Sequence, residues 1–231
     1  TAFLEKSIDS ELSANIIDLC PVGALTSKPY AFISRPWELK KVESIDLMDG
    51  IGSNVRFDIK GNKIMRVLPR VNELINEEWI SDKTRFAYDG LLTQRLDSGY
   101  IRENNKLVEV SNEKLVEIVS KKLNSSSRIA ALLGNNVDCE TIFAFKLFLE
   151  AFNCNSYDCR QDNSFFIPND RSSYTFNSKI SGIDDADLFL FIGCDLKKEA
   201  PILNARIRKR YLSSEKNLKI GYIGLGANYN Y

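Results

Sequence analysis

The amino-acid sequence predicts an α/β protein, and three observations support that fold class. Beyond about residue 110, short apolar strands alternate with helical patterns, as in a doubly wound parallel sheet with right-handed crossovers. Between residues 40 and 69, apolar residues instead follow the period of short β-strands joined by a tight turn. The 231 residues, 44% apolar and 27% charged, can bury one large or two small cores.

The first 69 residues predict little helix and a small β-rich domain. Residues 1–38 read as irregular, with one short helix around Asp9–Ile17 and prolines that interrupt the chain after it. The Gly61-Asn62 pair predicts a hairpin turn. The strands expected around it are Val42–Leu47, Asn54–Ile59 and Lys63–Leu68.

The rest of the chain predicts the alternating strands and helices. One predicted helix carries four phenylalanines that are expected to lie in the hydrophobic core: Phe143, Phe145, Phe148 and Phe152. A basic cluster that begins at Arg206 is expected on a solvated or inter-subunit face, because no aromatic platform for nucleic acid accompanies it. In chain order, the expected elements are helix Glu113–Leu123, strand Ser126–Gly134, helix Glu140–Phe152, strand Asp187–Gly193, helix Pro201–Leu212 and strand Leu218–Gly224.

Composition excludes several classes of function. The 31 basic and 31 acidic residues cancel, so no global charge favours nucleic acid, and no apolar run is long enough for direct membrane insertion. The absence of histidine excludes His-based catalysis and His metal ligands. The five scattered cysteines do not form a disulfide framework, and most are expected to be buried thiols. The chain begins at Thr1 inside a motif, so we expect a fragment.

Cys20 is the strongest candidate for a metal ligand. It is followed at once by Pro21 and then by small residues, which is how the last ligand of a ferredoxin-type 4Fe–4S site reads. Gly23 and Ala24 would let backbone N–H groups approach cluster sulfurs. No C-x-x-C-x-x-C triplet is present, so either Cys20 is an ordinary core thiol or its three partner ligands lie outside this sequence.

A second pattern marks a site that has lost its ligands. Asp46, Asp49, Ser53 and Ser81 follow the spacing D-x2-D-x3-S-x27-S. With cysteine at the four positions, this becomes the 4Fe–4S spacing at the head of molybdopterin-dependent oxidoreductases, which it resembles. Carboxylate and hydroxyl oxygens are poor ligands for such a cluster. We therefore predict that these four residues do not bind one.

Several segments together resemble the large iron–sulfur subunits (G type or 75-kDa type) of respiratory complex I, NADH:ubiquinone oxidoreductase. The resemblance covers nearly the whole chain, and it is most specific in the first hundred residues. The cluster-free second domain is similar to the mitochondrial and alphaproteobacterial branch. The segments that carry it include residues 10–32, 35–38, 43–46, 64–70, 75–91, 169–174, 182–187 and 199–209.

The resemblance implies a domain division and a cofactor. Residues 1–38 would end a ferredoxin-like 4Fe–4S region, 39–95 would form a 4Fe–4S Mo/W bis-MGD-type domain without its cluster, and 96–231 would begin a molybdopterin oxidoreductase-like α/β domain. Cys20 would be the fourth ligand of a 4Fe–4S cluster shared with residues outside this chain. No molybdopterin is expected, and no catalytic residue.

The implied function is electron transfer from NADH to ubiquinone as part of the proton-translocating reductase, with no independent active site in this chain. The implied partners are other peripheral-arm subunits and the upstream part of the same subunit. The expected location is the matrix side of the mitochondrial inner membrane or the cytoplasmic side of a bacterial inner membrane. Two alternatives remain: a fragment of a catalytic molybdopterin-dependent oxidoreductase, and a purely structural assembly subunit.

Overall fold

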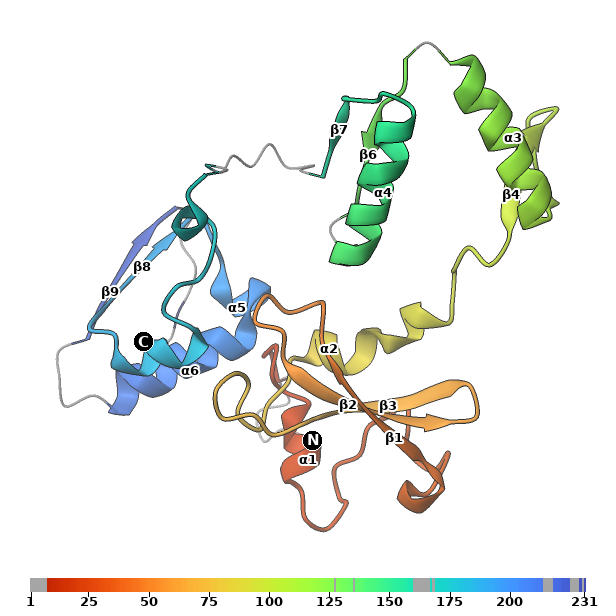
Figure 1. Ribbon diagram of the computed structural model, residues 1–231. Helices are drawn as coiled ribbons and strands as arrows, with labels where there is room; N and C mark the ends of the chain where they lie inside the picture. The colour runs from red at the N-terminus through yellow and green to blue at the C-terminus, as the bar shows by residue number, and fades with distance from the viewer. Residues whose placement is uncertain are drawn as a thin grey trace. The chain divides into compact units, whose positions relative to one another are not determined.

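The structure is a computed structural model that describes residues 8–126, 128–134, 136–159, 167, 169–213, 218–224, 229 and 231. The chain divides into two compact units, and the elements of each can be followed in Figure 1. The first unit combines Thr1–Thr93 with Thr175–Tyr231, and the second is Gln94–Tyr174.

The first unit contains a three-stranded antiparallel sheet in the order β1-β2-β3. Its strands are β1 (Lys40–Ile45), β2 (Asn54–Lys60) and β3 (Lys63–Pro69). Gly61 in the turn has φ +60°, a left-handed conformation that costs glycine little. The predicted hairpin is therefore confirmed, whereas β1 begins and ends two residues earlier than the sequence pattern predicts.

The core of this sheet is small and well buried. Val55 of β2 and Val67 of β3 pack with Ile80, and these three side chains are at most 2% exposed. Phe57, Ile64 and Tyr88 pack around them as partly buried neighbours. The loop that carries Ile80 is thereby held against the sheet just before helix α2 begins.

Short helices surround the sheet. The helix predicted around Asp9–Ile17 is wrong in its bounds, because single i→i+3 turns from Ser10 precede α1 (Asn15–Leu19). Ser81 is the N-cap of helix α2 (Asp82–Phe86), and its hydroxyl accepts a hydrogen bond from the N–H of Thr84. The remaining short helices here are η1 (Pro36–Glu38) and η2 (Ala87–Leu91).

The second unit holds an antiparallel hairpin, a parallel strand pair and two longer helices. The hairpin turns through Asn104 and Asn105, which both have positive φ, and the sequence reasoning missed it. The elements are β4 (Gly99–Glu103), β5 (Lys106–Val110), α3 (Asn112–Ser125), β6 (Ala131–Leu132), α4 (Cys139–Ala151), β7 (Tyr157–Asp158) and η3 (Arg171–Ser173).

The C-terminal part of the first unit packs around a second core. Ile183, Phe191 and Ile207 are buried together, with Phe189, Ile220 and several tyrosines around them. The elements are η4 (Ile180–Asp185), β8 (Leu188–Ile192), α5 (Leu196–Glu199), α6 (Pro201–Ser213) and β9 (Lys219–Ile223). All three predicted elements in this part are confirmed, each within two residues at its ends.

The α/β class is confirmed, since helices alternate with parallel strands in both units. Among the described residues, the parallel strands form two separate pairs, β6–β7 and β8–β9, instead of one continuous sheet. Within the same residues, no helix combines the length and the apolar character needed to cross a membrane.

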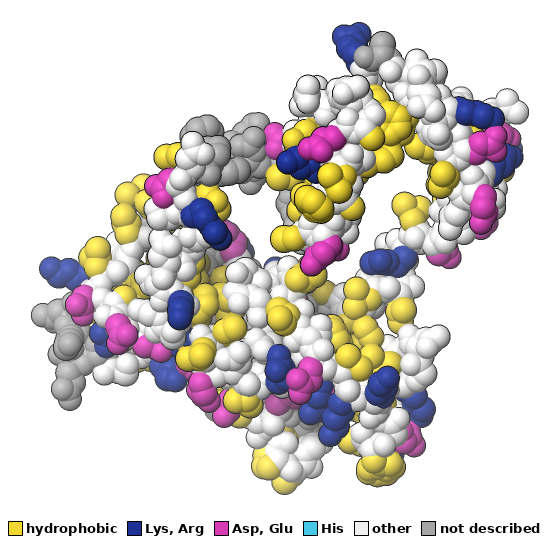
Figure 2. All heavy atoms as spheres, viewed as in Figure 1, with side chains coloured by type: hydrophobic (Ala, Val, Ile, Leu, Met, Phe, Trp, Pro, Cys, Tyr) yellow, Lys and Arg dark blue, Asp and Glu magenta, His cyan; other side chains and the backbone are white. Residues whose placement is uncertain are grey.

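Three predictions about burial are wrong. Phe143 and Phe148 are 62% and 44% exposed. Among the described residues of this unit, the parallel strand pair contributes just two residues on each strand, and Figure 2 shows hydrophobic side chains on the surface there. Arg206 of α6 is 4% exposed, because its guanidinium donates to the backbone carbonyl of Glu73 in the loop after β3. Cys154 alone among the five cysteines is buried, and Cys139 and Cys159 are exposed.

Candidate functional site

Cys20 lies where helix α1 ends and the backbone turns. The residue itself is extended, with φ −79° and ψ 105°, and stops the helix. Gly23 comes soon after with φ +67°, the left-handed region in which the absence of a Cβ removes the usual strain. The turn holds Cys20 half-buried, so its sulfur is accessible to a ligand.

The backbone amides that follow Cys20 favour its ionised form. The N–H groups of Leu25 and Val22 lower the pKa of the Cys20 thiol, and those of Ala24 and Gly23 add to the effect. A site rich in amide donors favours thiolate over thiol, and thiolate is the form that binds iron. The residues therefore fit one ligand position of an iron–sulfur cluster.

The described residues supply no further ligands at this position. No group of three or more His, Cys, Asp or Glu side chains suited to holding a metal ion occurs among them. A cubane needs four ligands. Within the part of the chain that the structure describes, Cys20 can therefore provide at most one of the four ligands.

The structure brings the four predicted lost-ligand positions into one buried region. Asp46, Asp49, Ser53 and Ser81 are each at most 9% exposed. The first three lie in and beside the β1–β2 loop, and Ser81 begins helix α2. Residues far apart in sequence thus meet, as the shared spacing predicts.

Thr84 joins these positions into a hydrogen-bonded set that we call the remnant network: Asp46, Asp49, Ser53, Ser81 and Thr84. The Thr84 hydroxyl donates to Oδ2 of Asp46 at 2.6 Å. Since that uses its one proton, the Ser81 hydroxyl 2.8 Å away must donate to Thr84. Sequence reasoning missed Thr84, although its place three residues after the N-cap serine was the available signal.

The other half of the remnant network is joined through the backbone. The Ser53 hydroxyl donates to Oδ2 of Asp49 at 3.2 Å. The N–H of Asp46 donates to the carbonyl of Ser53 at 2.8 Å. Each hydroxyl proton is thus donated to a carboxylate or to another hydroxyl oxygen, an arrangement that stabilises buried polar groups without any metal.

Asp49 makes stability depend on pH. Burial raises the pKa of its carboxyl above the ordinary 3.8, nearby Asp46 raises it further, and the Ile51 N–H and the Ser53 hydroxyl act the other way. The folded state therefore holds this proton more tightly than the unfolded state, which adds to the free energy of unfolding at low pH. That added stability is lost as pH rises through the folded pKa. We expect the free energy of unfolding, relative to Asp49→Asn, to fall as pH rises above about 3.8. Urea titrations of both proteins between pH 3 and 7 measure this difference in the free energy of unfolding. A difference that is constant or rises with pH would contradict the prediction.

Thr84→Val tests the bridge in the remnant network. Valine keeps the shape but leaves Oδ2 of Asp46 without this donor in a buried site. We expect a loss of about 1–3 kcal/mol in the free energy of unfolding. Thr93→Val is the control, because Thr93 is exposed and a change there stays within about 0.5 kcal/mol. Equal stability of the two variants in urea would rule out a structural role for the bridge.

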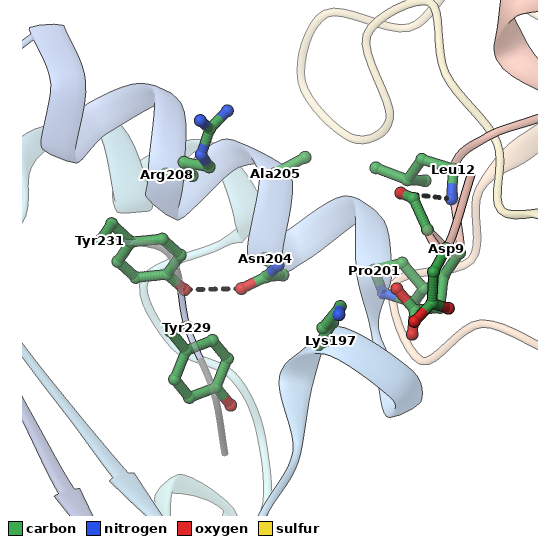
Figure 3. Close-up of a pocket in the computed structure, with 11 residues that line it drawn as sticks. Asp9, Leu12, Lys197, Pro201, Asn204, Ala205, Arg208, Tyr229 and Tyr231 are labelled. Carbon is green, nitrogen blue, oxygen red and sulfur yellow. Dashed lines mark hydrogen bonds between the residues drawn. The ribbon is translucent and has the colours of Figure 1, made fainter. Parts of the chain in front are cut away.

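A separate cavity of about 380 Å³ lies beside helix α6 in the first unit, as Figure 3 shows. Asp9, Lys197 and Arg208 give its wall mixed charge. The Tyr231 hydroxyl donates to Oδ1 of Asn204 at 2.5 Å, and burial raises the pKa of Tyr231 to about 12. The residues that line the cavity include no thiol, and we assign it no catalytic role.

Comparisons with protein families match the chain along most of its length. The NADH-quinone oxidoreductase subunit 3 ferredoxin-like domain matches residues 1–26, which include Cys20. The NADH-ubiquinone oxidoreductase NDSU1/NuoG-like 4Fe-4S domain matches residues 39–89, which include the remnant network. The molybdopterin oxidoreductase family matches residues 95–231.

Curated relatives are similar over nearly the whole chain. The G subunit of NADH-quinone oxidoreductase from Rickettsia felis is 48% identical over all of this chain and 34% of its own length. The NADH-ubiquinone oxidoreductase 75 kDa subunit of Reclinomonas americana is 44% identical, in a match that covers 100% of this chain and 36% of that subunit. The mitochondrial NADH-ubiquinone oxidoreductase 78 kDa subunit of Neurospora crassa is 47% identical, in a match that covers 96% of this chain and 31% of that subunit.

The chain thus spans about a third of the length of the curated relatives it matches. Their names agree with the resemblance that the Cys20 motif and the lost-ligand spacing indicate. On the match over residues 95–231, the chain belongs to the molybdopterin oxidoreductase family, and the relatives that it resembles are the G-type and 75–78 kDa subunits of NADH-quinone and NADH-ubiquinone oxidoreductases.

Proposed function

We propose that this chain is part of an electron-transfer subunit of respiratory complex I, and that Cys20 supplies the fourth ligand of a 4Fe–4S cluster. The observation that carries the proposal is the half-buried thiol where α1 ends, before the Gly23 turn, with a pKa that the backbone amides of residues 22–25 lower. The family match over residues 1–26 and the names of the relatives support it.

A cluster bound there supplies one-electron transfer. The chain's own contribution is a thiolate at a fixed position and amide dipoles directed at sulfur, which stabilise the more negative, reduced form and so set the potential. In the same proposal, residues 39–231 are scaffold, and Asp46, Asp49, Ser53 and Ser81 bind no cluster. Their hydrogen bonds to one another and to Thr84 support that part.

The proposal places the chain in the peripheral arm, on the matrix side of a mitochondrial inner membrane or the cytoplasmic side of a bacterial one. Its partners there are other subunits of the arm and the residues that provide the remaining ligands. NADH oxidation and quinone reduction take place on other parts of the complex, so this chain has no active site of its own and needs no molybdopterin.

The test replaces Cys20 with alanine in the full-length subunit within the assembled complex. We expect one 4Fe–4S signal to disappear from the EPR spectrum and iron content to fall by up to four atoms per complex. Cys139→Ala is the matched control, because Cys139 is exposed and distant in sequence. An unchanged spectrum in Cys20→Ala would sink the ligand assignment and favour the structural alternative.

The family match over residues 95–231 gives the catalytic alternative a specific basis. Metal analysis of the same purified complex decides between the two. Stoichiometric molybdenum or tungsten would favour a catalytic molybdopterin enzyme. Iron and sulfide without either metal would favour electron transfer alone.

A further inference from the structure

Helix α2 reaches from the remnant network to the residues that lead into Cys20. At its start, Ser81 bonds to Thr84, and Thr84 bonds to Asp46. At its other side, Arg85 donates to Asp18, two residues before Cys20, at 2.6 Å. One short helix is thus bonded to both the cluster-free site and the Cys20 motif.

Arg85 is buried among partners that belong to helix α1. Its side chain is 4% exposed, and its Nη2 also donates to Oδ1 of Asn15 at 3.1 Å. Asn15 in turn pairs with the backbone of Ile80, as donor to the carbonyl at 2.8 Å and as acceptor from the N–H at 3.3 Å. The guanidinium therefore fixes α1 against a loop that the sheet core already holds.

Asp82 adds a second connection between the same two helices. Its carboxylate accepts the Ser13 hydroxyl at 2.6 Å and the Ala14 N–H at 2.9 Å. Both donors lie just before the first turn of α1, where N–H groups lack partners within the helix. Asp82 holds the two residues before α1, and Arg85 holds Asn15 and Asp18 within it, so contacts from α2 constrain the direction in which the chain enters Cys20.

We propose that Arg85 is the positioning residue for Cys20: through Asp18 and Asn15 it sets where the thiolate and the amides after it lie. This inference rests on the proposed ligand role of Cys20. Residues that orient a metal ligand without touching the metal commonly change affinity 10- to 100-fold when replaced. Because the guanidinium forms bonds to two acceptors at once, lysine can replace only part of the effect.

The experiment uses the full-length subunit in the assembled complex with Arg85→Met, Arg85→Lys and Asp18→Asn. Lys83→Met, an exposed position on the same helix, is the matched control. The readouts are the EPR line shape and midpoint potential of the signal that Cys20→Ala removes, and the rate of iron release to a chelator. We expect Arg85→Met to shift line shape and potential and to raise iron release roughly 10-fold. Asp18→Asn should act in the same direction, and Arg85→Lys should restore part of the wild-type behaviour.

A purely structural defect would lower the yield of complex but leave the potential of each remaining cluster unchanged. Wild-type line shape, potential and iron release in Arg85→Met would overturn the proposal. If Arg85→Met does not assemble, Asp18→Asn decides, because it retains the buried guanidinium. A cluster signal that persists in Cys20→Ala contradicts the proposed function instead, whatever the Arg85 variants do.

Discussion

Replacing Asp58 with alanine is expected to lower the free energy of unfolding of the β-rich part by about 3–5 kcal/mol. Asp58 lies in β2 with its side chain 1% exposed. Its carboxylate accepts hydrogen bonds from Nε of Arg56 at 3.0 Å and from Nε of Arg66 at 2.8 Å. One carboxylate therefore forms ion pairs with two guanidinium groups. Its removal leaves two like charges close together and short of partners.

Urea unfolding followed by tryptophan fluorescence measures the effect, since Trp79 is half-buried and adjoins the core residue Ile80. Glu43→Ala is the control. Glu43 also pairs with an arginine, Arg70 at 3.3 Å, but is 70% exposed, so its loss should cost less than about 1 kcal/mol. Similar losses in the two variants would mean that burial of Asp58 adds nothing to its ion pairs.

Arg206→Met is expected to cost roughly 2–4 kcal/mol and to loosen one loop selectively. Nη1 of Arg206 donates to the carbonyls of Glu73 and Ile75, at 2.8 and 3.4 Å, and Nη2 donates to Asp184 at 2.8 Å. Methionine fills a comparable space but donates no hydrogen bond. The two carbonyls then lose their partner on α6, while Glu77 keeps Lys209 at 3.0 Å.

Hydrogen exchange at the amides of residues 72–77 reports on this loop directly, alongside urea unfolding. In Arg206→Met, we expect the amide exchange rates of residues 72–77 to rise much more than the exchange rates of the sheet β1–β3. Arg208→Met is the control on the same helix, because Arg208 is exposed and should change stability by less than about 0.5 kcal/mol. Unchanged exchange in the loop would show that Arg206 does not hold it.

Local signals account for the parts of the fold that the sequence predicts well. The β2–β3 hairpin arises from a glycine that takes positive φ, and α4 starts at Asp138, whose carboxylate accepts the N–H of Thr141 at 2.7 Å. The Asn104-Asn105 turn carried an equally local signal, since asparagine tolerates positive φ, but the strands beside it are mostly exposed and weakly apolar.

Long-range partners account for what the sequence did not predict. The basic pattern in α6 does not distinguish Arg206 from Arg208, because the carbonyls that bury Arg206 lie more than 130 residues earlier. Thr84 likewise gains its role from Asp46, 38 residues away. Asp46, Asp49, Ser53 and Ser81, which their spacing singles out, are all buried, whereas the hydrogen bonds by which Thr84 joins Ser81 to Asp46 appear only in three dimensions.

The connections from α2 to α1 also have a consequence for the order of events during synthesis. Arg85 and Asp82 contact residues 67 to 70 positions earlier, so the turn holding Cys20 lacks its supports until residue 85 has left the ribosome. We expect the Cys20 thiol of nascent chains stalled before α2 to react faster with an alkylating reagent than that of chains stalled well after it. Equal rates would contradict this order. If the order holds, assembly of the cluster proposed at Cys20 cannot be completed on its supported turn until helix α2 has been made and has packed against α1.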